Sequence, residues 1–414
     1  MATATPLAPA SPGTPAPALP DGAAAERAPR RAGRAARAPR RVAVAVHRWG
    51  GLIAGLVVAV LGLSGSALVF REEIDRALNP HLLVVAAPPN PTGPAHPRAP
   101  SPPRPPLQPA LDALAARFPG EPATRLRLPR RPDASVEVWL GAGPTRYAYV
   151  DPYTGRLLGD RRPTEFLTGW LFDLHAHLLA GEAGHQLAGW AAWALVALAL
   201  TGLRAGWPGR GKVRLALTVA RGRPVRRRTY DLHRAGGFWT SALLLVAGVT
   251  GASLVFHEAF QRALDGLTGS PALASVPRAR GATTAPSLPV DRALAEAARR
   301  VPDGVVSYVY LAARGEAPVQ VRLRRPSELH PNGKTFVTLR PHTGEVLAVA
   351  DGPGAPLGSR LYSALYPLHI GTVGGTGTRV VLVGVGLAPA ALFATGVLLR
   401  RTRRRGAARS RTPS

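Results

Sequence analysis

Four long blocks of apolar residues constrain the fold of this 414-residue chain more than any other feature. A helix needs roughly 17 to 25 residues to cross the hydrocarbon core of a bilayer, and each block has about that length with almost no charged side chain inside it. The blocks cover residues 49–70, 187–203, 235–256 and 380–399. They predict an α-helical membrane protein with four transmembrane helices.

The net charge of +28 could suggest a nucleic-acid-binding protein, but its distribution favours another interpretation. Residues 1–48, 204–234 and 400–414 together hold 25 basic and 3 acidic residues, whereas 71–185 and 257–379 hold 27 basic and 21 acidic. Basic residues in short flanks stay on the cytoplasmic side during insertion, which predicts cytoplasmic termini, a cytoplasmic middle loop and two extracytoplasmic segments. Basic residues confined to helix ends argue against nucleic-acid binding.

The chain has no Cys, and Met1 is its single Met. The absence of Cys rules out disulfides, iron–sulfur clusters and the covalent attachment of a c-type haem. Any haem ligated through side chains would therefore have to use His. The first apolar block is longer than the roughly 7 to 15 apolar residues of a signal peptide, which predicts a retained helix.

An internal repeat organises the chain. Residues 47–78 align without gaps on 233–264 and match at 14 of 32 positions. Two further correspondences follow, between 151–158 and 340–347 and between the Leu-His runs that end at His175 and His369. Each repeat is therefore predicted to consist of a span, an outer domain and a second span. Because both repeats begin on the same side of the membrane, they are predicted to be parallel, with a pseudo-twofold axis along the membrane normal.

The outer segments have the patterns of small α+β domains. The first has helical spacing over 109–118 and strand-like runs at 135–140 and 146–150. The second repeats this order with a helix at 290–300 and strands at 305–311, 319–323 and 335–339. Residues 1 to about 40 lack the larger apolar side chains needed for a core and are predicted to be disordered. The proline-rich run 88–109 is predicted to be a linker.

Two pairs of histidines occupy equivalent positions in the two repeats: His47 with His233, and His175 with His369. A twofold axis would bring the members of each pair face to face, one pair near each membrane surface. Two facing imidazoles are what a six-coordinate b-type haem requires, and Arg48 and Arg234 could pair with its propionates. Alternatively, a His-Arg sequence at the edge of a span is an interfacial anchor with no cofactor.

The runs that contain these histidines resemble a known family. HRWGGL at 47–52, DLHAHL at 173–178, YDLHR at 230–234 and PLHIG at 367–371 are similar to motifs of the PepSY-associated transmembrane family, also called iron-regulated membrane proteins. YVDPYTGRL at 149–157 resembles the end of a PepSY domain. The resemblance covers about residues 42–402. It implies that His47, His175, His233 and His369 occupy haem-binding positions. His177 departs from the family's run and is an alternative to His175 as outer ligand.

The resemblance and the repeat together predict four transmembrane helices in two parallel repeats, with two α+β PepSY-like periplasmic domains. The predicted order is a disordered tail 1–41, the first span 42–70, a periplasmic domain 71–174, the second span with its lead-in 175–204, a basic loop 205–232, the third span 233–257, a periplasmic domain 258–368, the fourth span with its lead-in 369–400 and a basic tail 401–414.

Members of this family are implicated in siderophore utilisation, and some are haem-containing reductases of ferric siderophores. The resemblance thus implies a bacterial inner-membrane oxidoreductase, in contact with membrane lipid, that carries two haems b. Electrons would pass from a cytoplasmic reductant or a quinol to a periplasmic ferric siderophore or other ferric chelate. One alternative is a non-enzymatic PepSY-domain protein that binds a peptide, a protease or a siderophore-uptake partner. A transporter is the last alternative, because the span centres lack ionisable residues.

Overall fold

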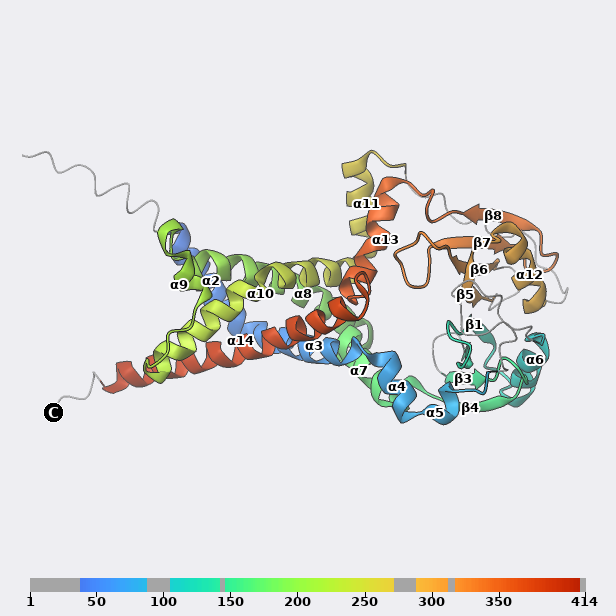
Figure 1. The fold of residues 1–414 in the computed structure, drawn as a ribbon, viewed down its shortest axis with the longest axis horizontal. Coiled ribbons are helices and arrows are strands. Elements are labelled where there is room, and N and C mark those ends of the chain that lie inside the picture. Colours follow the sequence, from blue (N-terminus) through green and yellow to red (C-terminus); the bar gives the residue numbers. More distant parts are fainter. Residues whose placement is uncertain (1–37, 88–104, 142–145, 272–287, 312–316, 410–414) are drawn as a thin grey trace, which may run out of the picture.

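The computed structural model describes residues 38–87, 105–141, 146–271, 288–311 and 317–409. Long helices form a bundle, and a β-sheet with short helices lies at one end of it (Figure 1). Helix α2 and the end of α14 lie at the opposite end of the bundle (Figure 1). Most of the predicted disordered tail and of the proline-rich linker lies outside the described residues, although α2 (Ala38–Ile53) already begins within the predicted tail.

Three helices of the described residues are long and apolar enough to cross a membrane by themselves. They are α8 (Gly181–Gly206), α10 (Val225–Val255) and the part Gly375–Thr402 of α14 (Gly375–Arg409). Helices α2 (Ala38–Ile53) and α3 (Gly55–Leu68) form a fourth candidate span only if they are counted together. They are bent by 63° where they meet. The first span, predicted as one continuous helix, is therefore a bent pair.

The bend of the first span is located at Ala54, directly before Gly55. A Cβ atom at Gly55 would lie 2.7 Å from the ring of Phe393 in α14, closer than real contacts allow. Glycine therefore lets α14 approach the helix at the point where its direction changes. Glycine is also a weak helix former, which lowers the cost of interrupting the helix there.

The bundle is built from two close helix pairs. Helix α10 packs along α8, and α14 packs along α3. A Cβ at Gly248 of α10 would lie 3.0 Å from the carbonyl oxygen of Ala192, and a Cβ at Gly62 of α3 would lie 2.3 Å from that of Gly386. Small residues at these crossings let the backbones approach closely, which is how transmembrane helices gain packing energy in lipid. Gly62 and Gly248 are equivalent in the repeat alignment.

Two sets of short helices and strands form the end of the molecule beside the bundle. Their elements follow the same order, except that α5 occurs only in the first set. The first set is α4 (Arg71–Leu78), α5 (Pro80–Leu83), α6 (Gln108–Arg117), β1 (Ala123–Arg127), β2 (Val136–Leu140), β3 (Arg146–Val150), β4 (Leu157–Arg161) and α7 (Leu167–His177). The second set is α11 (His257–Thr268), α12 (Val290–Arg300), β5 (Val305–Tyr310), β6 (Val319–Arg324), β7 (Thr335–Leu339), β8 (Val346–Ala350) and α13 (Leu357–His369). The short helix α9 (Val213–Leu217) lies in the loop between α8 and α10.

The two strand sets form one antiparallel sheet of eight strands, in the order β4-β3-β2-β1-β5-β6-β7-β8. Strand β1 of the first set pairs with β5 of the second, with Leu126 opposite Val309. The sequence predicts two separate outer domains, and no pattern in it indicates that β1 pairs with β5. The two halves thus meet edge to edge, which leaves no unpaired edge at the centre of the molecule.

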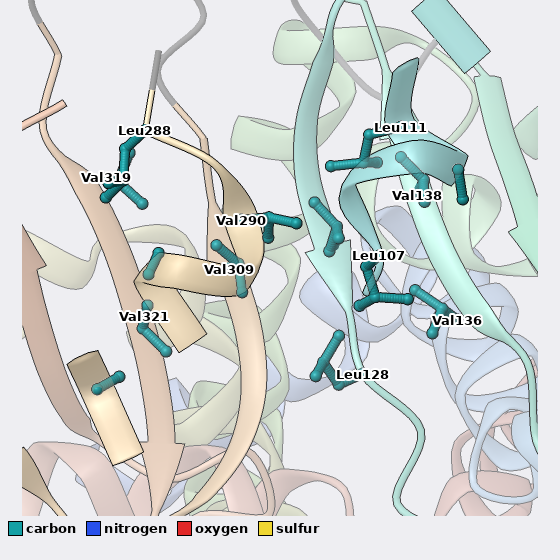
Figure 2. Packing of buried hydrophobic residues seen from close by; sticks show 14 of the residues in the cluster. Leu107, Leu111, Leu128, Val136, Val138, Leu288, Val290, Val309, Val319 and Val321 are labelled. Carbon is teal, nitrogen blue, oxygen red and sulfur yellow. The ribbon is translucent and has the colours of Figure 1, made fainter. Parts of the chain in front are cut away.

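The sheet has one apolar face and one polar face. Side chains of the apolar face, including Leu126, Val138, Val309 and Val321, pack under α6 and α12 in a single core (Figure 2). Each fully buried aliphatic side chain of this kind contributes about 1.5 to 3 kcal/mol of burial free energy. Because side chains alternate along a strand, the intervening residues lie on the opposite face. They include Arg125, Arg322, Glu137, Trp139 and several tyrosines, and those near the centre of the sheet face the helix bundle.

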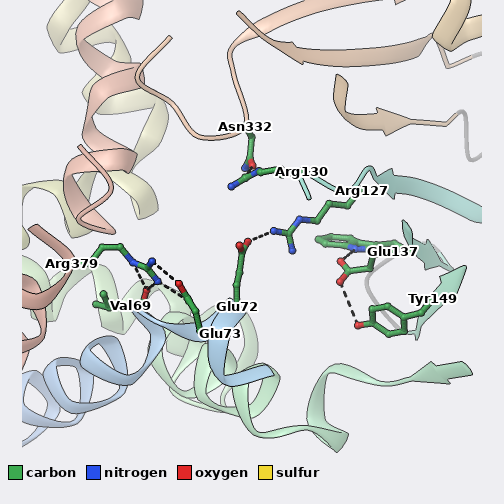
Figure 3. A network of polar contacts seen from close by, with 10 residues as sticks. Val69, Glu72, Glu73, Arg127, Arg130, Glu137, Tyr149, Asn332 and Arg379 are labelled. Carbon is green, nitrogen blue, oxygen red and sulfur yellow. Dashed lines mark hydrogen bonds and ion pairs between the residues drawn. The ribbon is translucent and has the colours of Figure 1, made fainter. Parts of the chain in front are cut away.

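Ion pairs connect the polar face of the sheet to the bundle (Figure 3). Arg127 of β1 pairs with Glu72 of α4, and Arg379 of α14 pairs with Glu73 at 2.6 Å. Burial alone would raise the pKa of Glu72, but Arg127 and Arg130 outweigh burial and hold it below its usual range. These contacts fix the sheet against the end of the spans.

Candidate functional site

The structure brings the histidines of each predicted pair together between helices. His47 of α2 and His233 of α10 have ring centroids 6.0 Å apart, at the end of the bundle away from the sheet. His175 of α7 and His369 of α13 have ring centroids 6.1 Å apart, at the end near the sheet. We call them the inner pair and the outer pair. A metal about 2 Å from a nitrogen of each ring would place the centroids roughly 6 Å apart, so both spacings suit one metal atom held from two sides.

Hydrogen bonds at Nδ1 determine how the inner histidines present themselves. His47 Nδ1 lies 3.0 Å from the carbonyl oxygen of Leu198 in α8, which can only accept a hydrogen bond. His233 Nδ1 lies 2.9 Å from the hydroxyl of Thr395 in α14, and that hydroxyl already donates to the carbonyl of Ala391 at 2.8 Å. The carbonyl of Leu198 requires the proton on Nδ1 of His47, and the bond from Thr395 to Ala391 favours the same tautomer for His233. This tautomer leaves the lone pair of Nε2 available to a metal.

The outer histidines are held in the same way. His175 Nδ1 lies 2.9 Å from the carbonyl oxygen of Leu61 and 3.2 Å from the hydroxyl of Ser64, both in α3. His369 Nδ1 lies 3.0 Å from the hydroxyl of Thr250 in α10, which itself donates to the carbonyl of Val246 at 2.7 Å. The carbonyl of Leu61 thus requires the proton on Nδ1 of His175, and the bond from Thr250 to Val246 favours the same tautomer for His369, with Nε2 available in both.

All four rings rest on the same dipeptide, a hydroxyl residue followed by glycine, which we call the hydroxyl–glycine seat. The seats of His175, His47, His369 and His233 are Ser64-Gly65, Thr201-Gly202, Thr250-Gly251 and Thr395-Gly396, respectively. A Cβ on the seat glycine would lie 2.8 to 3.6 Å from Cε1 of the ring. Glycine therefore lets Cε1 of the ring approach the neighbouring helix closely, with Nδ1 near the hydroxyl beside it.

The seats were not predicted from the sequence, although their hydroxyl residues recur in the repeat with the same spacing as the histidines. Ser64 and Thr250 are separated by 186 residues, as are His47 and His233. Thr201 and Thr395 are separated by 194 residues, as are His175 and His369. A search for polar residues that recur with the spacing of the histidines would have found them.

The inner pair opens into a cavity of about 590 Å³ between the helices. Its walls are mainly leucine, valine and glycine, with the aromatic side chains of Trp49, Phe238 and Phe393, and Arg48 and Arg234 also line it. Arg234 Nη2 lies 3.1 Å from the buried carboxylate of Asp231. The buried Nε of Arg234 has no hydrogen-bond partner among the described residues, so an anionic group of a ligand could satisfy it.

This set of residues fits a b-type haem better than a bare metal ion. Two imidazoles could bind the haem iron, the apolar walls suit a macrocycle, and the arginines suit its carboxylates. A bare ion would need more protein ligands, and no group of three or more His, Cys, Asp or Glu in the described part of the chain could hold one.

His177 does not take part in the outer pair. Its Nδ1 lies 3.1 Å from Asp173, and its ring lies 5.3 Å from that of His185. His185 Nδ1 in turn lies 3.0 Å from the carbonyl oxygen of Ala176. Of the two candidates for the outer position, His175 is therefore the one that faces His369.

Apolar helices long enough to cross a bilayer, joined to a mixed body of helices and strands, define a membrane protein. The chain belongs to the PepSY-associated TM region family, whose model matches residues 44–403. This match includes all four paired histidines and confirms the resemblance noted from the sequence. No curated protein matches the chain.

Proposed function

We propose that this protein is an inner-membrane b-type haem protein that passes electrons from the cytoplasmic side to a periplasmic ferric chelate, such as a ferric siderophore. The observation that carries the proposal is the repeated arrangement of two histidine pairs at opposite ends of the bundle. In each pair the hydrogen bonds at Nδ1 leave both Nε2 atoms available. A b-type haem at each pair would supply one-electron redox chemistry.

The protein's own residues would hold and tune that chemistry. His47 and His233 would hold the iron of the inner haem, and His175 and His369 that of the outer haem. Hydrogen bonds at Nδ1 orient a ligating imidazole and increase its basicity. Arg48 and Arg234 would bind the propionates of the inner haem, and the apolar cavity walls would exclude water from it.

The proposed direction of transfer follows from the predicted topology. With cytoplasmic termini, the inner pair would face a cytoplasmic reductant or a quinol, and the sheet would lie in the periplasm. The two parallel repeats would then place one pair near each membrane surface. Reduction of a ferric chelate to Fe(II) weakens binding by hard oxygen ligands, which would release the iron for uptake.

A spectrum of the purified protein tests this function. After expression with sufficient haem, we expect the dithionite-reduced protein to show b-type absorbance, and His47→Ala and His369→Ala each to lose about half of it, because each pair would hold one haem. His177→Ala is the matched control, because this neighbour of His175 belongs to neither pair. A colourless protein would favour the alternative of a non-enzymatic PepSY-domain binding protein. Unchanged absorbance in both alanine variants would reject the ligand assignment.

A further inference from the structure

A second cavity, of about 310 Å³, lies between the polar face of the sheet and α13. Strands β1, β5 and β6 and the segment before β7 form one wall, and α13 with the end of α10 forms the other. Its lining includes three basic residues, Arg125, Arg322 and Lys334. No acidic side chain lines it among the residues that the structure describes.

The three basic residues differ from most arginines near the sheet because they have no carboxylate partner. Elsewhere, Arg76, Arg127, Arg161, Arg325 and Arg379 all form ion pairs. Within the described ranges, no carboxylate lies within 4.0 Å of the charged groups of Arg125, Arg322 or Lys334. The guanidinium of Arg125 instead lies 4.2 Å from the ring centroid of Trp139, and the ammonium of Lys334 lies 5.9 Å from that of Tyr362. Arg322 donates to the carbonyl oxygen of Gly333 at 2.9 and 2.6 Å, a partner that does not neutralise its charge. Positive charge that no carboxylate neutralises favours an anionic ligand.

Titration of the neighbouring groups agrees with a positive potential in this cavity. Burial and, to a smaller extent, Arg322 lower the pKa of Lys334 to about 8, against an opposing effect of Glu328. Burial, Arg322 and Lys334 together lower the pKa of His330 to about 2. The part of both shifts that comes from neighbouring cations reflects a positive field, which would stabilise a bound anion.

Aromatic rings form the remaining walls of the cavity. Tyr308 and Tyr310 stack with their centroids 6.0 Å apart, and His330 stacks on Tyr366 at 4.9 Å with an angle of 16° between the rings. Flat rings of this kind offer stacking surfaces to a planar aromatic ligand. A ligand that is both anionic and aromatic would therefore use the cavity better than a simple inorganic anion.

The cavity lies directly beside the outer histidine pair. Tyr366, which lines it, belongs to the same helix as His369 and precedes it by three residues. Residues three apart on a helix lie on the same side of it. A ligand in the cavity would therefore lie within one helical turn of a histidine of the outer pair.

We propose that this cavity binds an anionic, aromatic metal chelate, such as a catecholate complex of iron(III), in preference to a neutral complex. Its role as the acceptor site rests on the proposed electron-transfer function, whereas its selectivity for the ligand does not. Arg125, Arg322 and Lys334 contact the oxygen atoms of the ligand, and the tyrosines stack on its rings.

Gallium(III) complexes separate binding from electron transfer, because gallium(III) prefers the same oxygen ligands as iron(III) but is not reduced under these conditions. The probes are the anionic gallium complex of 2,3-dihydroxybenzoate and the neutral gallium tris(acetohydroxamate). Calorimetric titration into the full-length protein in detergent measures the affinity for each. Lys334→Gln and Arg125→Gln remove cavity charges, and Arg340→Gln is the matched control because Arg340 is paired with Glu345 outside the cavity.

We expect the anionic complex to bind at least about tenfold more tightly than the neutral one, since charge-assisted contacts exist only for the former. Each cavity variant should weaken its binding about tenfold, with little change in Arg340→Gln. Equal affinity for both complexes, or unchanged binding in both cavity variants, would overturn the proposal even if the b-type absorbance is present. Dihexanoyl phosphatidylglycerol provides a further test. If Lys334→Gln weakens its binding as much as it weakens binding of the anionic gallium complex, the cavity is a lipid-headgroup site and the proposal is overturned. Selective binding to a colourless protein would support the cavity and reject only the electron-transfer function.

Discussion

The inner and outer histidine pairs are built alike but surrounded differently. In both pairs each ring lies on a hydroxyl–glycine seat of another helix, and the centroids are 6.0 and 6.1 Å apart. The inner pair opens into an apolar cavity between the spans, with arginines in its lining. The outer pair instead lies near a basic, aromatic cavity under the sheet, because α13 carries both His369 and Tyr366 of the cavity lining. The repeat accounts for the shared geometry of the two histidine pairs, whereas their surroundings differ.

The polar face of the sheet shows a related difference between two of its regions. At its outer strand β4, Arg161 donates to both carboxylate oxygens of Asp75, at 2.8 and 2.6 Å, and to the hydroxyl of Tyr149. Its guanidinium also covers the ring of Phe166 at 3.6 Å. Arg125, Arg322 and Lys334, which line the cavity, have no carboxylate partner among the described residues. The region around β4 thus pairs its charge, whereas the region at the cavity retains charges that a ligand could satisfy.

If the two pairs are built alike, both should depend on the hydroxyl groups of their seats. Removing one seat hydroxyl from each pair tests this most strongly. Thr250→Val and Thr395→Val keep the shape of the side chain but leave Nδ1–H of His369 or His233 without that acceptor. Loss of such a partner typically lowers metal affinity about 10- to 100-fold. We expect each variant to lose haem from its own pair only, measured as haem content and as the reduced spectrum.

Thr240→Val is the control for these two variants. Thr240 lies in α10, like Thr250, but its hydroxyl donates to the carbonyl of Gly236 and not to a histidine. Its haem content should equal that of the unmodified protein. A loss in one pair and none in the other would mean that only one pair depends on its seat.

The seat glycines provide a test with a smaller expected effect. A Cβ at Gly202 would lie 2.9 Å from Cε1 of His47, whereas a Cβ at Gly396 would lie 3.6 Å from Cε1 of His233, an ordinary contact. Gly202→Ala should therefore displace His47 and weaken haem binding at the inner pair about tenfold, as overpacking of a core does. Gly396→Ala adds the same methyl group and is the matched control. Equal haem retention in the two variants would show that the inner site tolerates a shift of His47.

The sequence predicted the features that depend on one residue type or on the repeat. Apolar block length predicted the spans, and the repeat alignment singled out His47, His175, His233 and His369 among 11 histidines. The structure places each predicted couple together. Their role as haem ligands stays a prediction.

Features that arise from packing between distant segments were not predictable in the same way. The bend at Ala54 lies beside the close approach of Gly55 to Phe393, and these two residues are far apart in the sequence. The pairing of β1 with β5 depends on the meeting of two separate strand sets, and it creates the polar face on which Arg125 and Arg322 lie. No local pattern shows that Arg125 lacks a carboxylate partner while Arg161 has one.

The pH dependence of ligand binding tests the outer side of the comparison and has the smallest expected effect. A bound anion favours the charged form of Lys334, whose pKa of about 8 in the free protein lies below the ordinary value of 10.5. Lys334 is therefore mostly charged below pH 7 and mostly neutral above pH 9. Two neighbours lie outside this window, since burial raises the pKa of Tyr362 and His330 has a pKa of about 2. The other charged groups that face Lys334 are Arg322 and Glu328, and Glu328 accepts a hydrogen bond from the backbone N–H of Lys334.

The quantity to measure is the affinity of the unmodified protein for the anionic gallium complex divided by that of Lys334→Gln, because this ratio cancels titration of the ligand itself. If the bound anion raises the pKa of Lys334 by about one unit, the ratio should fall about fivefold between pH 6.5 and pH 9. Arg125→Gln provides the comparison, since an arginine stays charged and its ratio should remain constant over the same range. A Lys334 ratio that is flat or rises with pH would show that its charge does not contact the ligand. The selectivity of the cavity would then have to come from Arg125 and Arg322 alone.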